Sequence, residues 1–409
     1  MKWWDNQLNN ALKIVERYQH KEPFHKQLRR NLKQLRAGSK DRRTISQFCF
    51  NTLRLARLLH DLDPKSRMIT ANALLLATWT DQIQYYVDGL DDEPLKKLLN
   101  ELNMQPINSR VKQFCSSQEL NLENIFPFPD HVADTVKGEE FYLAHTSTRD
   151  VFVWCKKDSR KKIVEKFKKK GFTIEVNSEL KDSASLKANT DIQNILGLDA
   201  GLVEVQDISS QLALSKIDIT HDDVVWDCCA GSGGKAMHLA DKHHGPIWLV
   251  SDKRTSIQHN LKKRMKSVTK YFAQAELDLL QNDEEHIVFN KLDGHIYETK
   301  HENVDLILLD APCTGSGTWA RNPEHLGAFQ EDKIAKFASV QLALLKAAWK
   351  YLKKGGSLHY MTCSVYEAEN ENLIQEFVQS STETKLVSQS YYGSGYKGDR
   401  LFKAHLTKM

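Results

Sequence analysis

Apolar residues recur at helical spacing through the first 125 residues of the chain. Leu8, Leu12 and Val15 share one helix face, and the run from residue 45 to residue 58 repeats the pattern. Two prolines in segment 121–130 interrupt it, so we place a domain boundary there. The pattern therefore predicts a helical domain over residues 1–125.

The pattern changes between residues 126 and 200. Residues 151–154 form a short β-type run, and residues 159–170 form a basic helical run that ends at Gly171. Residues 172–176 are again typical of a strand. We expect a small αβ subdomain over residues 126–200.

From about residue 200 onward, strand-like and helix-like runs alternate, which predicts an α/β domain with a parallel sheet over residues 201–409. One helix is expected over residues 334–352, ended by Gly355 and Gly356. The strands are expected at residues 224–227, 247–252, 286–290, 306–310, 357–361, 385–391 and 400–406.

The composition of the 409 residues, 41% hydrophobic and 27% charged, is that of a soluble globular protein. No run approaches the roughly 18 apolar residues of a membrane helix, and the N-terminal residues lack an apolar stretch of signal-peptide length. We therefore expect a cytoplasmic protein with no membrane partner. Seven cysteines without a C-x-x-C spacing indicate neither a disulfide framework nor a metal site.

Charge is distributed unevenly along the chain. Residues 1–70 hold 16 Lys and Arg against 6 Asp and Glu, whereas residues 71–150 hold 6 against 13. Residues 156–170 contain 9 basic and 2 acidic side chains. Segregated basic blocks are typical of a protein that binds a polyanion such as RNA, although each block alone could simply be a solvated helix face.

A glycine-rich segment lies between a predicted strand and a predicted helix. Glycines there let the backbone approach a ligand closely at a helix N-terminus. The segment fails as a P-loop, because Ala236 stands where Ser or Thr is needed. It fits a dinucleotide fingerprint in which Ala236 replaces the third glycine. The spacing alone is therefore compatible with a nicotinamide dinucleotide as the ligand. The segment reads Cys229-Ala230-Gly231-Ser232-Gly233-Gly234-Lys235.

Acidic residues are expected at the ends of three successive strands. Asp252 lies 21 residues beyond Gly231, a spacing suited to hydrogen bonds with ribose hydroxyls. Asp293 is expected where its carboxylate could accept a hydrogen bond from an adenine amino group, and Asp310 ends the strand before Cys313. Each could instead be a helix cap or a turn residue.

Two cysteines, Cys313 and Cys363, each follow a predicted strand. Ligands of open α/β sheets bind beyond the carboxyl ends of the strands, so both thiols should point into one crevice. A thiolate that adds to carbon 6 of a pyrimidine ring makes carbon 5 a nucleophile. An acid must then neutralise the ring, and a base must remove the carbon-5 proton. The local residues do not decide which cysteine attacks.

Four motifs together resemble the RsmB/NOP (Sun/Fmu) family of RNA 5-methylcytosine methyltransferases. They occur in the family's order over about 200 residues, and jointly they are specific. Besides the glycine-rich segment they are Gln206-Asp207-Ile208-Ser209-Ser210-Gln211, Asp310-Ala311-Pro312-Cys313-Thr314-Gly315-Ser316-Gly317 with Arg321-Asn322-Pro323-Glu324, and Thr362-Cys363-Ser364 with Glu369-Asn370-Glu371.

The resemblance implies a role for each candidate site residue. It makes Cys363 the nucleophile and Cys313 the thiol that assists release of the methylated base. It implies that S-adenosylmethionine is the cofactor and that Asp310 also lies near the cytosine edge. The implied cofactor contacts are Cys229, Ala230, Gly231, Ser232, Gly233, Gly234, Lys235, Asp252, Asp293 and Asp310.

The resemblance also implies the architecture, a Rossmann-like class I methyltransferase domain after a helical NusB-like RNA-binding domain and a small αβ RNA-binding subdomain. The chain departs from the family in three places, one of which is near its end, where Asp399-Arg400-Leu401-Phe402-Lys403-Ala404 replaces the common Gly-Phe-Phe pattern. Gly231-Ser232 replaces the usual Ala-Pro, which should make the loop less stiff. The Arg-Val-Asn often found at the subdomain's first strand is absent from residues 152–155.

We therefore expect a monomeric RNA cytosine-5 methyltransferase that uses no metal, with ribosomal RNA favoured over transfer RNA. Two other classes remain open. A nicotinamide-dependent oxidoreductase would leave both strand-end cysteines unexplained. A catalytically idle RNA-binding or assembly protein would need neither thiol.

Overall fold

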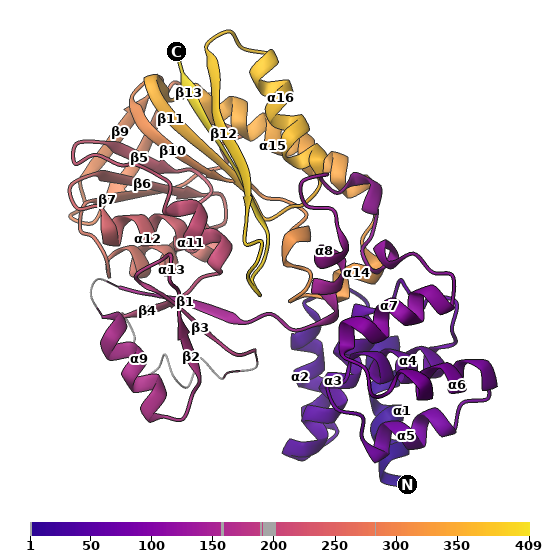
Figure 1. Cartoon of the computed structure of the whole chain (residues 1–409). Coiled ribbons are helices and arrows are strands. Elements are labelled where there is room, and N and C mark those ends of the chain that lie inside the picture. The colour runs from indigo at the N-terminus through magenta and orange to yellow at the C-terminus, as the bar shows by residue number, and fades with distance from the viewer. Residues whose placement is uncertain (1, 157–158, 189, 191–201, 283) are drawn as a thin grey trace. The chain divides into compact units, whose positions relative to one another are not determined.

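The computed structural model describes residues 2–156, 159–188, 190, 202–282 and 284–409 (Figure 1). The chain forms two compact units. One contains residues 1–148 and 319–331, and the other contains residues 149–318 and 332–409. The predicted boundaries near residues 125 and 200 stay predictions.

The first unit is helical. Leu8, Ala11 and Ile14 are buried on one face of α1, and Phe24, Leu28 and Leu32 recur at helical spacing on α2. The Asp63 side chain caps α4, accepting hydrogen bonds from the amides of Lys65 and Ser66. The helices are α1 (Lys2–Glu16), α2 (Phe24–Gln34), α3 (Ser39–Arg54), α4 (Pro64–Leu75), α5 (Asp81–Asp88), α6 (Glu93–Leu102), α7 (Ile107–Ser117), α8 (Glu139–Leu143) and α14 (Glu324–Ala328).

Residues 319–331 belong to this helical unit although they follow the Cys313 motif in the chain. Trp319 is 1% exposed and packs against Phe126, with ring centroids 5.3 Å apart. The buried Glu324 carboxylate accepts a hydrogen bond from the amide of Phe24 at 3.1 Å. Arg54 Nη1 donates to the carbonyl oxygen of Ala320 at 2.8 Å. The segment after the predicted release cysteine is thus fixed in the helical unit.

The second unit begins with a four-stranded antiparallel sheet in the order β2-β3-β1-β4. Helix α9 (Arg160–Lys169) packs on it through Ile163, Val164 and Phe167, while its Lys and Arg side chains lie outside the core. The strands are β1 (Val151–Cys155), β2 (Ile174–Val176), β3 (Ser183–Leu186) and β4 (Val203–Val205). The predicted strand–basic helix–strand pattern is present.

A nine-stranded sheet forms the rest of this unit, in the order β12-β13-β11-β10-β5-β6-β7-β8-β9. Its five central strands are parallel, and both pairs of outer strands are antiparallel additions. The strands are β5 (Val224–Asp227), β6 (Ile247–Asp252), β7 (Phe272–Glu276), β8 (His286–Lys291), β9 (Ile296–Lys300), β10 (Val304–Asp310), β11 (Leu352–Thr362), β12 (Thr384–Tyr392) and β13 (Leu401–Lys408).

Helices cover both faces of this sheet (Figure 1). Leu306 and Leu308 of β10 face one helix group, and Ile307 and Leu309 face the other. The first group is α11 (Ile208–Leu214), α12 (Gly234–Lys242) and α13 (Thr255–Met265), and the second is α15 (Asp332–Trp349) and α16 (Glu371–Gln379). This is the predicted Rossmann-like α/β architecture.

Three details of the large sheet differ from the sequence prediction. Helix α15 ends at Trp349 rather than at residue 352, because Leu352 already begins strand β11. Gly355, within this strand, has a φ of 77°. Strands β7 and β9 were not predicted. Strand β8 runs antiparallel to β7, so the sheet is mixed rather than parallel.

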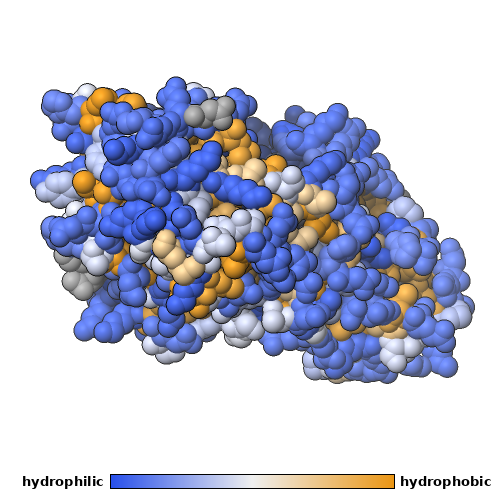
Figure 2. All heavy atoms as spheres, turned by 90° about the horizontal axis from the view of Figure 1, so that it is seen from above, coloured by the Kyte–Doolittle hydropathy of each residue, from blue (hydrophilic) through white to orange (hydrophobic). Residues whose placement is uncertain are grey.

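The face seen in Figure 2 is mainly hydrophilic, with separate hydrophobic patches. No helix among the described residues combines the length and the apolar character that a membrane crossing requires.

Candidate active site

A cavity of about 400 Å³ lies at the carboxyl ends of the central parallel strands, all within the second unit. This is the edge at which open α/β sheets bind ligands. Six of the predicted site residues line the cavity: Cys229, Gly231, Asp252, Asp310, Cys313 and Cys363. Ala230, Ser232 and Gly233 lie in the same loop between β5 and α12, and Gly234 and Lys235 are the first two residues of α12.

Two loop glycines adopt conformations that other residues rarely adopt. Gly231 has a φ of 54° and Gly233 a φ of 82°. A Cβ atom at Gly233 would also lie 2.8 Å from Leu261 Cδ1 of α13. The loop therefore requires glycine at these positions to pass close to α13 and to present its amides at the start of α12.

Asp252 ends β6 and is tightly held. Its Oδ2 atom accepts the Gly231 amide at 2.9 Å and Arg254 Nη2 at 2.8 Å. Its Oδ1 atom accepts the Arg254 amide at 3.0 Å and Arg254 Nε at 2.8 Å. Burial opposes ionisation, but the bonds from Arg254 and Gly231 together hold the pKa of Asp252 below its usual value. The direct bond to Gly231 joins the two predicted cofactor-binding elements.

Lys235 joins the start of α12 to the carboxyl end of β10. Its Nζ atom donates to Asp310 Oδ2 at 2.5 Å. Burial opposes its charge, but Asp310 and Cys363 together raise the pKa of Lys235 above its usual value. Burial raises the pKa of the Cys363 thiol to about 12, and the Lys235 ammonium works against this rise. The side chains of Lys235, Asp310 and Cys363 thus form one electrostatic cluster.

The two cysteine loops lie next to each other because β10 and β11 are paired in parallel, with Asp310 opposite Met361. The Gly317 amide donates to the carbonyl oxygen of Cys363 at 2.8 Å, which joins the loops directly. Burial raises the pKa of the Cys313 thiol well above its usual value, and the neighbouring Cys363 adds to this rise. Both thiols line the same cavity.

Glu369 belongs to a sequence motif, but the sequence alone predicts no role for it. Its fully buried carboxylate accepts the Thr314 amide at 2.9 Å and Gln341 Nε2 at 2.8 Å. It also accepts the hydroxyl groups of Thr314 and Ser364. Burial raises the pKa of Glu369. This carboxylate thus joins the residues that directly follow Cys313 and Cys363, a role that only the buried contacts could reveal.

Asp293 does not reach this edge of the sheet. It lies in the turn between β8 and β9, where its Oδ1 accepts the His295 amide at 3.0 Å. Because β8 is antiparallel, Lys291 pairs with Ala273 near the start of β7. The prediction that Asp293 stands at the cofactor edge is therefore wrong. Asp278, just beyond the end of β7, lines the cavity instead, and it was missed because β7 was not predicted.

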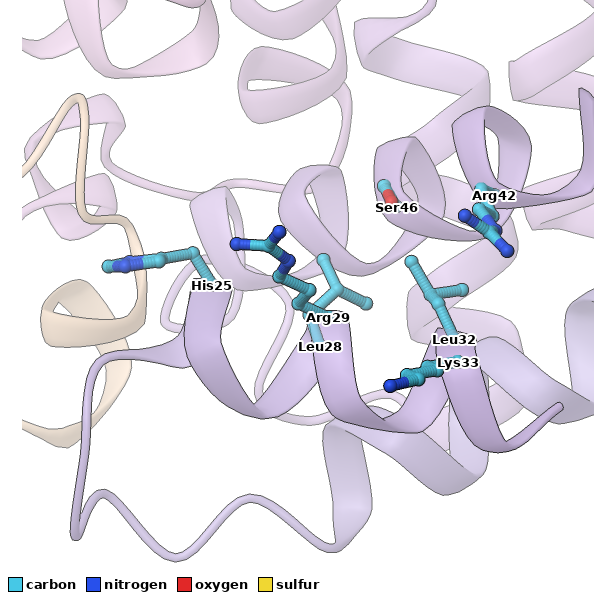
Figure 3. Close-up of a pocket in the computed structure, with 7 residues that line it drawn as sticks. All are labelled: His25, Leu28, Arg29, Leu32, Lys33, Arg42 and Ser46. Atoms are coloured by element: carbon cyan, nitrogen blue, oxygen red, sulfur yellow. The ribbon is translucent and has the colours of Figure 1, made fainter. Parts of the chain in front are cut away.

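A second candidate surface lies in the helical unit, where α2 and α3 border a groove of about 720 Å³ (Figure 3). Arg29 and Lys33 come from α2 and Arg42 from α3, with Leu28 and Leu32 between the cationic groups. His25 and Ser46 complete the lining. Cationic side chains around a groove suit a phosphate backbone. In the described portion of the chain, no cluster of three or more His, Cys, Asp or Glu side chains is arranged to hold a metal ion.

Residues 215–401 match the family model of 16S rRNA methyltransferase RsmB/F. The methyltransferase domain belongs to the RsmB/NOP family. One relative of this RsmB/NOP domain is the ribosomal RNA small subunit methyltransferase B of Vibrio cholerae, 29% identical over 217 residues, which are 53% of this chain and 47% of that protein. The chain spans about half the length of the curated relatives it matches.

Solved structures share the fold. That of PH0851 has a TM-score of 0.69 at 18% identity and covers 98% of both chains. NSun6 from Pyrococcus horikoshii, solved with the S-adenosylmethionine analogue SFG, has a TM-score of 0.54 at 16% identity, covering 74% of this chain and 97% of that one.

The RsmB/NOP family decides between the cofactors that the glycine spacing left open, and the cofactor is S-adenosylmethionine. The cavity fits that molecule. It has the volume of a small-ligand site, a carboxylate at the end of β6, and the apolar side chains of Leu277 and Leu279 beside it. The alternative of a nicotinamide-dependent oxidoreductase is therefore set aside.

Proposed function

We propose that this protein transfers a methyl group to carbon 5 of a cytosine in RNA through a covalent bond to Cys363. The observation that carries the proposal is the convergence of two thiols and one carboxylate on a single cavity. Asp310 ends β10, Cys313 follows β10 and Cys363 follows β11, and these two strands are paired in parallel. A cytosine methyltransferase needs an attacking thiol, an acid for the ring and a way to release the adduct.

Attack forms a bond between Cys363 Sγ and carbon 6 of the ring, while a proton moves to the ring nitrogen. S-adenosylmethionine would supply the methyl group to the carbon-5 nucleophile that results and leave as S-adenosylhomocysteine. A base then takes the carbon-5 proton, the sulfur–carbon bond breaks, and the ring nitrogen returns its added proton to the departing thiolate, which frees the thiol and the methylated base. We assign assistance in this last step to Cys313, which shares the cavity with Cys363.

The pKa of Cys363 bears on the first step. A thiol with a pKa of about 12 is neutral at pH 7, so attack requires that its proton leave as the bond forms. Asp310 interacts electrostatically with Cys363 and is held by Lys235. We assign Asp310 the proton transfer at the cytosine edge, and Lys235 the orientation of Asp310 and the stabilisation of developing thiolate charge.

A base inside a duplex cannot present its ring face to a thiol inside a cavity, so the target cytosine must be flipped out or lie in a single strand. The groove between α2 and α3 and the basic helix α9 supply cationic side chains for the phosphates. The relatives named as ribosomal RNA methyltransferases favour ribosomal RNA. Transfer RNA is the second candidate.

Bisulfite sequencing of total RNA tests the proposal and identifies the substrate. A strain that lacks the gene should lose one or a few protected cytosines, and restoring the full chain should bring them back. Loss in ribosomal RNA supports the favoured substrate, and loss in transfer RNA supports the alternative. An unchanged cytosine protection pattern in both RNA classes would favour an RNA-binding protein without this activity.

A further inference from the structure

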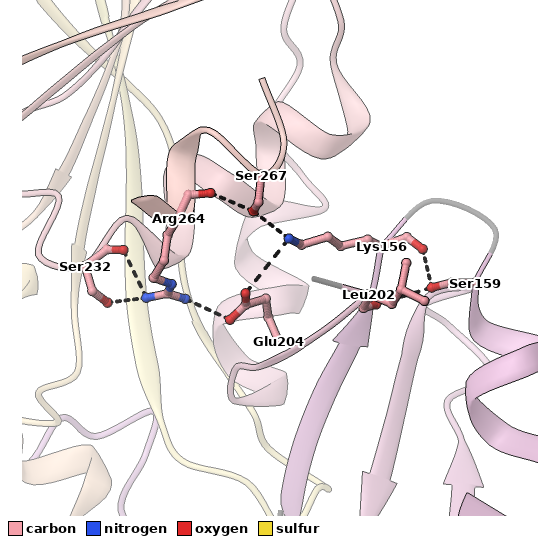
Figure 4. Close-up of polar contacts among 7 residues, drawn as sticks. All are labelled: Lys156, Ser159, Leu202, Glu204, Ser232, Arg264 and Ser267. Atoms are coloured by element: carbon pink, nitrogen blue, oxygen red, sulfur yellow. Dashed lines mark hydrogen bonds and ion pairs between the residues drawn. The ribbon is translucent and has the colours of Figure 1, made fainter. Parts of the chain in front are cut away.

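A polar network joins the cofactor loop to the small antiparallel sheet (Figure 4). Arg264, in the last turn of α13, donates from Nη1 to the carbonyl oxygen of Ser232 at 3.0 Å and also to the Ser232 hydroxyl. Its Nη2 atom donates to Glu204 Oε2 at 3.0 Å. One guanidinium therefore bridges the glycine-rich loop and strand β4.

Lys156 completes a ring of polar contacts with Glu204, Arg264 and Ser267. Lys156 Nζ lies 4.0 Å from Glu204 Oε1 and donates to Ser267 Oγ at 2.8 Å. Ser267 in turn donates to the carbonyl oxygen of Arg264 at 2.7 Å. The Lys156 side chain is only 6% exposed, and those of Arg264 and Glu204 are 23% and 22% exposed. Charge-assisted hydrogen bonds from a planar guanidinium that is shielded from solvent fix geometry better than exposed ion pairs do.

Ser232 is the point at which the loop most needs support. It stands between Gly231 and Gly233, both in left-handed conformations, and glycine leaves the backbone free to move. Within the described residues, the Ser232 amide donates no hydrogen bond. The sequence already predicts a loop less stiff than one with Ala-Pro at this place. Arg264 restrains both oxygen atoms of this residue.

We propose that Arg264 is a positioning residue for the S-adenosylmethionine loop and that Glu204, from the small sheet, holds Arg264 in place. Neither side chain is among the residues that line the described cavity, so both act through Ser232. The small sheet is then part of the cofactor site as well as a candidate RNA-binding element. The inference rests on the proposed function only through the identity of the cofactor.

Two measurements on the full-length protein test the inference, with Arg264→Gln, Arg264→Lys and Glu204→Gln as variants. Calorimetry gives the affinity for S-adenosylhomocysteine without any RNA. Hydrogen exchange of the loop amides 229–236 in ligand-free protein reports loop order without any cofactor. Glu298→Gln is the matched control, because Glu298 pairs with His286 on β8 and β9 of the same unit and its substitution removes the same charge.

We expect Arg264→Gln and Glu204→Gln each to weaken S-adenosylhomocysteine binding by about 5- to 20-fold, the scale of one hydrogen bond. Loop amides should exchange faster in both variants and at an unchanged rate in Glu298→Gln. Arg264→Lys should restore part of the affinity, because it keeps one donor but loses the fork. The double variant should be no weaker than Arg264→Gln alone, since both substitutions break one network.

Normal affinity and normal loop exchange in folded Glu204→Gln would overturn the inference, whether or not Arg264→Gln folds. Equal losses in Glu298→Gln would also overturn it, because the effect would then be one of general charge. If the unsubstituted protein bound no S-adenosylhomocysteine, the cofactor assignment itself would fail, which is a different result from variants that bind normally.

Discussion

The Glu369 carboxylate accepts a hydrogen bond from the backbone amide of Thr314 at 2.9 Å, across 55 residues of sequence. With the bonds from Gln341 and from the hydroxyl groups of Thr314 and Ser364, four donors surround its two oxygen atoms. Since a carboxylate has about four acceptor positions, the match between donors and acceptors is complete. This buried carboxylate therefore ties the two cysteine loops together, in addition to the direct bond between the Gly317 amide and the Cys363 carbonyl oxygen.

We predict that Glu369→Gln destabilises the protein by about 1–3 kcal/mol, because the new amide nitrogen cannot accept these bonds and leaves buried donors unpaired. Chemical denaturation of both proteins measures this difference. Glu376→Gln, on the partly exposed surface of α16, is the matched control and should change stability little. Equal stability of Glu369→Gln and the unsubstituted protein would contradict the joining role of Glu369.

Asp252 provides the test of the cofactor site. Removing its carboxylate takes away the group assigned to the ribose hydroxyls and releases the Gly231 amide, so Asp252→Ala should weaken S-adenosylmethionine binding by about 1–3 kcal/mol. Asp293→Ala is the control, because Asp293 lies in the turn after β8 at the far edge of the sheet. Calorimetry showing an unchanged affinity for Asp252→Ala would remove Asp252 from the site.

These two aspartates also show how far the sequence could predict the site. The position of Asp252 at the cavity could be predicted because β6 is a mostly buried and apolar run that ends in an acidic residue. Strand β7 has the weak sequence Phe-Ala-Gln-Ala-Glu and was overlooked, so Asp293 after β8 was taken as the next strand end. Strand direction depends on pairing between distant residues, which a local pattern does not encode.

Contacts between distant segments likewise could not be predicted from the sequence. The four family motifs, with both cysteines, could be recognised because their order and residues are jointly specific. The fixing of residues 319–331 in the helical unit depends on Trp319 and Glu324, whose partners Phe126 and Phe24 lie 193 and 300 residues earlier in the chain. The same holds for the bond between Arg264 and Glu204.

RNA binding through phosphates should depend on the groove between α2 and α3. We predict that Arg29→Gln with Lys33→Gln weakens RNA binding and lowers the slope of log affinity against log salt by about 0.7 for each phosphate that is no longer neutralised. Filter binding at several salt concentrations measures this slope. Cofactor affinity should not change.

The control for the groove is Lys97→Gln, which removes an exposed charge from α6. Point variants are preferable to deletion of the N-terminal helices, because deletion would expose Trp319 and Glu324 and so disturb the segment that follows Cys313. A salt slope equal to that of the unsubstituted protein would show that the groove does not contact the RNA backbone.

Cys313→Ala should attack and methylate RNA but release it slowly, because the proposed role of Cys313 begins after methyl transfer. Denaturing gels should then show protein linked to ordinary RNA substrate, a band that the unsubstituted protein lacks. Adding Cys363→Ala should abolish the band. Normal turnover without a band would mean that Cys313 is only a packed small residue, the usual state of a buried cysteine.

The attack of Cys363 on cytosine is the central claim, and trapping with RNA that contains 5-fluorocytosine tests it most directly. Fluorine cannot leave as the carbon-5 proton does, so the adduct between Cys363 and carbon 6 should persist on a denaturing gel. We predict that the unsubstituted protein and Cys313→Ala form this adduct and that Cys363→Ala forms none, although it still binds S-adenosylmethionine. An adduct of normal yield in Cys363→Ala would show that another residue is the nucleophile.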